Sequence, residues 1–155
     1  MPRPSNTQER RTQITRGLIK VMAKRGYDGA SVADIAKAAR LTPGLVHYHF
    51  DSKQHILLAA LRGLVEHHEA RLDAKLGEAR GDPVAELAAF IDVHLGLGAE
   101  AAPDALACWI LLSGEALREA KVRAEVDKAL SALIARVARV IRSGVEKRVF
   151  ACQSA

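Results

Sequence analysis

The chain has 155 residues, of which 49% are hydrophobic and only 4% aromatic, and its formal net charge is +5. This length allows one substantial core, or a small head fused to a larger body. The apolar stretches are far shorter than the roughly 20 residues that a membrane-spanning helix needs, and residues 1–5 lack the apolar segment of a secretory signal, so we expect a cytoplasmic protein without a membrane partner.

The positive charge is concentrated near the N-terminus. Residues 1–53 carry ten Lys/Arg against four Asp/Glu, or +6, whereas residues 54–155 carry 13 against 14, or −1. A basic segment on a near-neutral body is typical of a protein that binds phosphate groups with one end of the molecule. Charge alone leaves open the alternative of a solvated basic face.

The first predicted element lies in residues 7–24, where apolar side chains recur at helical spacing with basic residues between them. Ile14, Leu18, Val21 and Met22 fall on one face of this segment, which predicts an amphipathic helix. Gly26 suits the residue that follows the end of such a helix, because glycine adopts the left-handed conformation at little cost.

Two shorter helices are predicted next. Ser31 stands where an N-cap is expected, with Asp34 three residues on in a weakened form of the capping box. After Arg40, Thr42 can cap a third helix with Pro43 at its first position, where the missing N–H costs nothing. Two short helices separated by about four residues predict a helix-turn-helix, the geometry that lays a helix N-terminus in the major groove of DNA.

The remainder of the chain predicts four more helices, and no segment alternates as a strand would. They cover residues 52–77, 84–97, 103–119 and 121–149, with Gly–Asp–Pro at 81–83 as the clearest break. We therefore expect an all-α fold, with a three-helix head in residues 1–53 and a helical-bundle body in residues 54–155. The helix that begins near Ser52 joins the two.

The segment from Ser31 to Leu58 reads SVADIAKAARLTPGLVHYHFDSKQHILL. It resembles the DNA-binding head of tetracycline-repressor (TetR) type regulators, in which a Thr/Ser-x-x-x-Ile-Ala helix and a tight turn precede Gly-x-Leu-Tyr-x-Tyr/His-Phe and a Leu-rich helix. The resemblance covers about residues 8–60 and agrees in order, spacing and residue type.

The resemblance implies a role for each matching position. The residues that hold the three helices together are Val32, Ile35, Ala36, Leu41, Val46 and Phe50. Those that face the groove are Thr42, Pro43, Gly44, Leu45, His47 and Tyr48, and those that touch phosphates are Ser31, His49 and Lys53. Physical chemistry agrees, because the N–H groups at the helix N-termini near Ser31 and Thr42 favour an anion and Lys53 adds a mobile charge. His47 departs from the family, which most often has Tyr there, and its imidazole could make DNA affinity depend on pH.

The body resembles the family's effector-binding and dimerisation domain more loosely. Its helix pattern and the segment CWILL at 108–112 are similar to choline-response regulators. Phe90 and His94 share one helical face, and Trp109 and Ser113 share another, so these four are the candidate ligand-binding residues. Core packing explains the aromatic members equally well. The chain stops soon after its seventh predicted helix, so either it is truncated or dimerisation uses surfaces other than the family's last helices.

The resemblance implies a repressor that binds a pseudo-palindromic DNA operator as a homodimer and is released by a small-molecule effector. Two alternatives stay open, an architectural DNA-binding protein without an effector and a small helical enzyme, although no phosphate loop or nucleophile motif indicates catalysis. We expect no catalytic residues, cofactor or metal. His47 and His49, two residues apart on a helix, point about 200° from one another and cannot converge on one ion.

Overall fold

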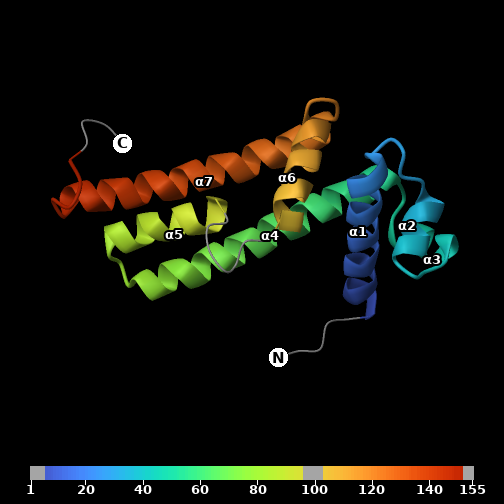
Figure 1. Cartoon of the computed structure of the whole chain (residues 1–155), viewed down its shortest axis with the longest axis horizontal. Coiled ribbons are helices and arrows are strands. Elements are labelled where there is room, and N and C mark those ends of the chain that lie inside the picture. Colours follow the sequence, from blue (N-terminus) through green and yellow to red (C-terminus); the bar gives the residue numbers. More distant parts are fainter. Residues whose placement is uncertain (1–5, 96–102, 152–155) are drawn as a thin grey trace. The chain divides into compact units, whose positions relative to one another are not determined.

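The computed structural model describes residues 6–95 and 103–151. Over these residues the chain forms seven helices and no strand (Figure 1), which confirms the all-α prediction. The helices are α1 (Asn6–Arg25), α2 (Val32–Ala38), α3 (Pro43–His49), α4 (Lys53–Ala79), α5 (Pro83–Leu95), α6 (Pro103–Ala116) and α7 (Ala120–Glu146).

The described residues fall into two compact units. The first lies within Met1–Leu64 and Asp104–Val126, and the second within Val65–Pro103 and Asp127–Ala155. The long helices α4 and α7 therefore each contribute one part to the first unit and one part to the second. The predicted division at residue 53, into a DNA-binding head and a helical body, stays a prediction.

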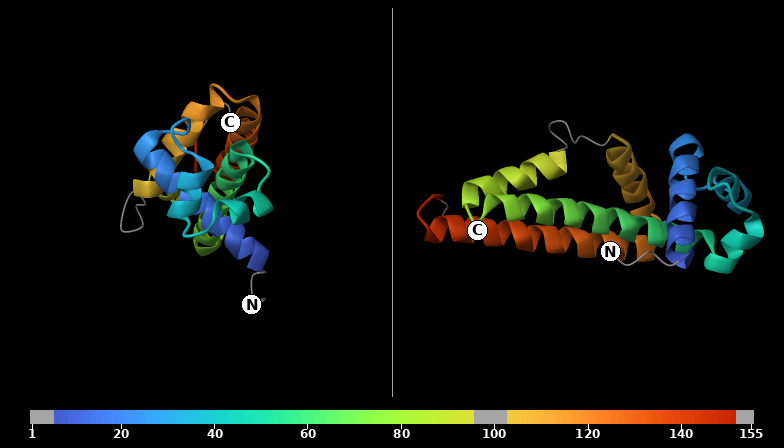
Figure 2. Two further views of the ribbon diagram at one scale, coloured as in Figure 1. Left: turned by 90° about the vertical axis from the view of Figure 1, so that its right-hand side faces the viewer. Right: turned by 90° about the horizontal axis from the view of Figure 1, so that it is seen from below.

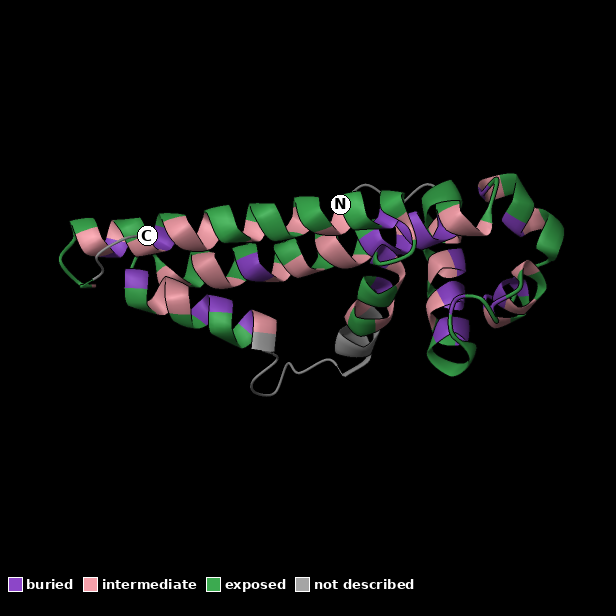
Figure 3. Cartoon of the chain, turned by 90° about the horizontal axis from the view of Figure 1, so that it is seen from above, coloured by how far each residue is buried: buried purple, intermediate pink, exposed green. Residues whose placement is uncertain are grey.

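The first unit contains the three-helix head, in which α2 and α3 lie on the same side of α1 (Figures 1 and 2). The predicted apolar stripe of α1 is buried, since Ile14 and Leu18 are fully inaccessible and Val21 and Met22 nearly so. Figure 3 shows the buried positions of α1 on one face of the helix. Gly17 lies in the same stripe, and a Cβ atom there would be 2.8 Å from the Ile35 carbonyl oxygen, so the α1–α2 crossing is closer than a side chain allows.

The connection between α2 and α3 is a tight turn closed by two backbone hydrogen bonds. The Leu41 N–H donates to the Ala36 carbonyl at 2.9 Å and the Arg40 N–H donates to the Lys37 carbonyl at 3.1 Å, the pattern of a Schellman motif. Such a motif needs a left-handed residue after the C-cap Ala39, and Arg40 supplies it with φ 55°. This turn sets the angle at which α3 leaves α2.

The head core continues into the first part of α4. Four of the six residues predicted to hold the head together, Ile35, Ala36, Val46 and Phe50, are buried, while Val32 and Leu41 are half-buried. Apolar side chains before α2 and in the first part of α4 are buried as well: Tyr27, Ala30, Ile56, Leu57, Leu58, Ala60 and Leu61. Burial of a large apolar side chain contributes about 1.5–3 kcal/mol of transfer free energy, so the first part of α4 is an integral part of the first unit.

The second unit is a layer of three helical segments, with α5 beside the later parts of α4 and α7 (Figure 1). Its core consists of Leu72, Phe90, Val93 and Val140. The α4–α5 turn has Arg80 and Gly81 in the left-handed region, and the Asp82 carboxylate accepts from the Val84 N–H at 3.1 Å. The predicted Gly–Asp–Pro break is thus confirmed.

Two helices, α6 and α7, end earlier than predicted, and in both a donor from outside the helix hydrogen-bonds to carbonyl groups near its end. α6 ends at Ala116 rather than at 119, because Arg123 donates to the carbonyls of Ala116 and Leu117 at 3.0 and 2.9 Å. α7 ends at Glu146 rather than at 149, because the Val149 N–H turns back to the Gly144 carbonyl at 2.8 Å. The predicted end of α5 at 97 lies outside the described residues. No helix within the described ranges is long and apolar enough to cross a membrane.

Candidate nucleic-acid interface and ligand site

The third helix presents most of its predicted groove-facing residues to solvent. Thr42, Pro43, Gly44 and His47 are exposed, and Leu45 is half-buried. Tyr48 is 81% exposed although it is a large aromatic side chain. Its ring meets that of His49 edge to face, with centroids 5.0 Å apart. An exposed aromatic ring on a short helix is typical of a binding surface, because large aromatic side chains that bind no other molecule are usually buried.

Both short helices have side-chain caps at their N-termini, as predicted. The Thr42 hydroxyl accepts from the Leu45 N–H at 3.3 Å. The Ser31 hydroxyl accepts from the Asp34 N–H at 3.1 Å, and the Ser31 N–H donates to the Asp34 carboxylate at 3.3 Å, which completes the capping box. The Ser31 hydroxyl also donates to that carboxylate at 2.6 Å. Hydrogen bonds from the Ser31 hydroxyl, and then from its backbone, hold the pKa of Asp34 below its ordinary value. The Ser31 side chain is therefore already engaged before any phosphate arrives.

The Lys53 ammonium contacts Tyr27 within the first unit. It donates to the Tyr27 carbonyl at 2.9 Å and lies 4.2 Å from the centroid of the Tyr27 ring. Burial, and then the negative charges of Glu119, Glu115 and Asp28, raise the pKa of Tyr27 to about 12. An ammonium has three donors, so Lys53 retains the capacity to bind a phosphate from this position.

Arg11, which the sequence analysis did not single out, fixes the end of α3. Its guanidinium donates to the His49 carbonyl at 2.6 Å and lies 4.1 Å from the centroid of the Phe50 ring. These contacts join α1 to the last turn of α3 across 38 residues of sequence. The spacing of α1 alone identifies Arg11 only as a base beside the apolar stripe.

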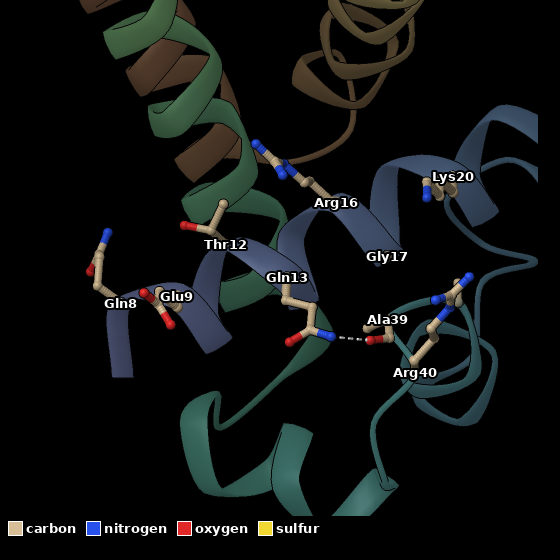
Figure 4. A pocket seen from close by; sticks show the side chains of 10 residues that line it. Gln8, Glu9, Thr12, Gln13, Arg16, Gly17, Lys20, Ala39 and Arg40 are labelled. Carbon is tan, nitrogen blue, oxygen red and sulfur yellow. Dashed lines mark hydrogen bonds between the residues drawn. The ribbon is translucent and has the colours of Figure 1, made fainter. Parts of the chain in front are cut away.

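A groove of about 590 Å³ lies between α1 and the α2–α3 turn (Figure 4). The Gln13 amide crosses it and donates to the Ala39 carbonyl at 2.6 Å. Three cationic side chains and one carboxylate line it, so its charge is positive. The ten lining residues are Gln8, Glu9, Thr12, Gln13, Arg16, Gly17, Lys20, Ala38, Ala39 and Arg40.

The head is also tied to the corner between α6 and α7 within the first unit. The Arg118 guanidinium lies 2.9 Å from the Asp28 carboxylate, and the Gln54 amide donates to the Glu119 carboxylate at 2.5 Å. Asp28 precedes α2, and Gln54 is in the first turn of α4. The helix-turn-helix is thus connected to the α6–α7 turn by side chains as well as to α4 by the backbone.

The candidate ligand-binding residues divide between the two units. Phe90 and His94 lie on α5 in the second unit, where Phe90 is buried in the core and His94 is half-buried. Trp109 and Ser113 lie on α6 in the first unit, with Trp109 half-buried and Ser113 exposed. Within residues 109–116, the part of α6 whose side chains the structure describes, the buried residues are Leu112 and Ala116. The four residues as one ligand site stay a prediction.

His94 has a partner that the sequence analysis missed, His68 on α4. The two Nε2 atoms lie 2.9 Å apart, and His94 Nδ1 lies 2.8 Å from the Phe90 carbonyl oxygen. Burial, and then the charges of His94 and Arg71, lower the pKa of His68 to about 4. A signal was present, because His68 lies four residues before the buried Leu72 and so on the inward face of α4.

Taken together, two short capped helices at a tight turn, an exposed second helix and a basic surround define a helix-turn-helix DNA-binding domain. Comparison with known proteins agrees: residues 14–60 match the family described as bacterial regulatory proteins, tetR family. The DNA-binding head, residues 14–60, is thus of this family.

Similar regulators extend the match beyond the head. The HTH-type transcriptional regulator BetI of Rhizobium meliloti is 29% identical over 124 residues, which cover 79% of this chain and 60% of BetI. The regulator TtgR of Pseudomonas putida is 35% identical over 77 residues, covering 50% of this chain and 37% of TtgR. The chain thus spans about 60% or less of the length of these curated relatives.

Solved structures show the same architecture. A transcriptional regulator from Saccharomonospora viridis in complex with choline has a TM-score of 0.79 at 28% identity, covering 95% of this chain and 76% of that one. A transcriptional regulator from Rhodococcus sp. Rha1 has a TM-score of 0.75 at 29% identity, covering 84% and 68%. The named relatives are transcriptional regulators, not enzymes.

Proposed function

We propose that this chain is a ligand-responsive transcriptional repressor that binds operator DNA through α3 and its capped N-terminus. The exposed face of α3 carries this proposal, because Tyr48 and His47 stand on a helix whose opposite side is fixed by Val46 in the head core. Base edges are read by side chains on such a helix, while phosphates are bound by N-terminal N–H groups and cations around it. Such a protein acts on chromosomal DNA, and hence in the cytoplasm.

The phosphate contacts that we propose come from two sets of residues. The first is the predicted set of Ser31, His49 and Lys53. The second consists of Arg16, Lys20 and Arg40, the cations of the groove between α1 and the turn. These groups add a sequence-independent attraction that falls as salt rises.

Operator binding is tested by selecting duplexes from a random library with the purified chain and measuring affinities at several salt concentrations. Tyr48→Ala should reduce the ratio of selected-site to random-site affinity, whereas Tyr48→Phe, which keeps the ring, should retain more of it. His67→Ala, an exposed position on α4, is the control. Equal affinity of the wild type for selected and random duplexes would refute sequence-specific binding and favour the architectural alternative.

We further propose that a small molecule bound near α6 releases the DNA. The ion pair between Arg118 and Asp28 connects the turn that follows α6 to the residues before α2, so a shift of α6 passed on through this turn would move the head. The regulator from Saccharomonospora viridis was solved with choline, which makes choline the first compound to test. Trp109, the single tryptophan of the chain, lies on α6 and reports binding by fluorescence.

The effector proposal predicts that Trp109→Phe abolishes the fluorescence signal, and that Trp109→Ala weakens effector-induced release while leaving operator affinity nearly unchanged without effector. Reciprocal linkage requires operator DNA to weaken effector binding by the same factor as effector weakens operator binding. An effector that binds but leaves operator affinity unchanged would refute the release mechanism without affecting the proposal of DNA binding.

A further inference from the structure

The pair of His68 and His94 is the feature of the second unit that DNA binding does not use. The two imidazoles come from neighbouring helices, α4 and α5, and their Nε2 atoms lie 2.9 Å apart. The ring centroids are 4.4 Å apart and the ring planes are inclined by 81°. If the two Nε2 atoms pointed directly at each other across 2.9 Å, the ring centroids would be more than 4.4 Å apart. The two rings therefore meet at an angle.

The hydrogen bond of His94 fixes its tautomer. The Phe90 carbonyl can only accept, so His94 Nδ1 carries a proton, and in the neutral imidazole its Nε2 then presents a lone pair toward His68. Histidine ligands of metals almost always donate their other ring N–H to a carbonyl, a carboxylate or water, which is the arrangement that His94 has here. Without a metal, His68 Nε2–H donates to that lone pair.

We propose that His68 and His94 form a two-histidine site for a divalent transition-metal ion of tetragonal preference, Cu²⁺ or Ni²⁺. With metal–nitrogen bonds of about 2.0–2.1 Å, ligands at a right angle stand about 2.9 Å apart, and tetrahedral ligands about 3.3–3.4 Å. The distance between the Nε2 atoms matches the right-angled case. Square-planar or tetragonal nitrogen coordination is characteristic of Cu²⁺ and Ni²⁺, with water completing the coordination.

Metal binding requires one proton to move. His68 exchanges its Nε2 proton for one on Nδ1 through solvent, so that both Nε2 atoms can donate lone pairs and no net proton is released. The positive charges of Arg71 and Arg136 act on His68 and oppose a dication. The Arg136 guanidinium is itself paired with the Asp73 carboxylate, which offsets part of this repulsion.

The site is tested with the untagged full chain, titrated with CuCl₂ or NiCl₂ and followed by calorimetry. The matched control is His67→Ala, because His67 is exposed on the same helix, one residue from His68. We expect His67→Ala to retain the binding of one equivalent. His68→Ala and His94→Gln should each lose at least about tenfold in affinity, the loss that follows even when only an outer-shell partner of a ligand is removed. Circular dichroism verifies that each variant keeps its helices.

Pulsed electron paramagnetic resonance of the Cu²⁺ complex identifies the ligands independently of affinity. The wild type should show two equatorial imidazoles, and each single variant at the pair should show one fewer. Equal binding by wild type, His68→Ala and His94→Gln would overturn the proposal and place the ion at other histidines. Absence of one-equivalent binding by the folded wild type would overturn it as well, leaving a hydrogen-bonded pair only.

Discussion

At the scale of single residues, the head contains a backbone conformation that is unfavourable for any residue with a side chain. Arg40 occupies the left-handed conformation that closes the α2–α3 turn, with φ 55°. A residue other than glycine pays about 1–2 kcal/mol in this conformation. The geometry persists because the two turn hydrogen bonds and the burial of Ala36 and Ala39 on either side determine it.

Arg40→Gly should therefore stabilise the chain. Relief of the left-handed strain outweighs the roughly 0.5–1 kcal/mol by which glycine favours the unfolded chain, so we expect a net gain of up to about 1 kcal/mol. The midpoint of urea unfolding measures it, and Arg40→Ala, which keeps the strain, is the control. A gain for alanine equal to that for glycine would show that the turn is not strained.

The same Arg40→Gly change should weaken binding to random duplex DNA, since it removes one cation of the groove.

Gly17 presents the opposite case, a position where any side chain is excluded. Gly17→Ala should destabilise the chain by about 1–3 kcal/mol, the usual cost of overpacking, because its Cβ would lie 2.8 Å from the Ile35 carbonyl oxygen and 3.0 Å from the Ala39 Cβ. Gly63→Ala on α4 is the control: nothing lies within 4 Å of a Cβ there, so the better helix former should stabilise by up to about 1 kcal/mol. Equal effects at both sites would contradict a close α1–α2 crossing.

At the scale of elements, the sequence predicted which segments are helical, because caps and apolar spacing are local signals. Thr42 with Pro43, and Ser31 with Asp34, mark helix starts that the structure confirms. Helix ends were less predictable, since they depend on groups elsewhere in the chain. Arg123 acts on the last carbonyls of α6 from the following helix, and no pattern within α6 indicates it.

The sequence predicted the candidate DNA-binding site only in part. The exposed residues of α3 follow from the family pattern and from the period of a helix that has Val46 on its inner side. Partners from distant segments do not follow: the Tyr27 carbonyl that holds Lys53, and His68 opposite His94, are 26 residues away in each case. Helical periodicity places a residue on a face but does not choose its neighbour.

Lys53 at the start of α4 carries a prediction about electrostatics. Lys53→Ala should weaken binding to selected and random duplexes together and reduce the salt slope by about one unit, since one phosphate contact is lost. The structure adds a second effect, because the ammonium also leaves the Tyr27 carbonyl and ring. Thermal unfolding of each variant separates the two effects. An unchanged salt slope in a folded variant would exclude Lys53 from the phosphate contacts.

At the scale of the whole molecule, the release mechanism that we propose connects the effector site to the DNA-binding helices through the turn after α6 as well as through α4. The ion pair between Arg118 and Asp28 is well exposed, with side chains 69% and 79% accessible, so its contribution to stability is at most about 1 kcal/mol. Its position matters more than its strength, because it joins the turn after α6 to the loop that positions α2.

Arg118→Ala should thus reduce the factor by which effector weakens operator binding, while thermal stability changes little. Typical allosteric coupling is about 1–3 kcal/mol, and this single contact carries part of it. We therefore expect the effector affinity measured without DNA to stay within about threefold of the wild-type value. Operator affinities with and without effector provide the measurement, and Lys121→Ala, an exposed cation at the start of α7, is the control. A coupling factor equal to that of the wild type would exclude the ion pair from the release mechanism.

Assembly is the remaining property of the whole molecule, and the exposed face of α7 is the surface that we propose for it. Leu130 and Ile134 lie four residues apart on this helix and are 49% and 67% exposed. Two apolar side chains one turn apart and open to solvent are costly in a monomer, and pairing with a second copy would bury them. Two linked heads also bind DNA more tightly than one, because the second head binds at a high effective concentration.

The double variant Leu130→Gln with Ile134→Gln should convert a dimer to a monomer at micromolar concentration, as measured by analytical ultracentrifugation. Operator affinity should then fall by about 10²-fold or more through the loss of effective concentration, whereas the affinity of a single head for random duplex should change little. The control is Val84→Gln on α5, a position with 53% exposure, which should leave the dimer intact. A double variant that stays dimeric would place the interface elsewhere, and a wild type that binds operator tightly as a strict monomer would contradict assembly on the DNA altogether.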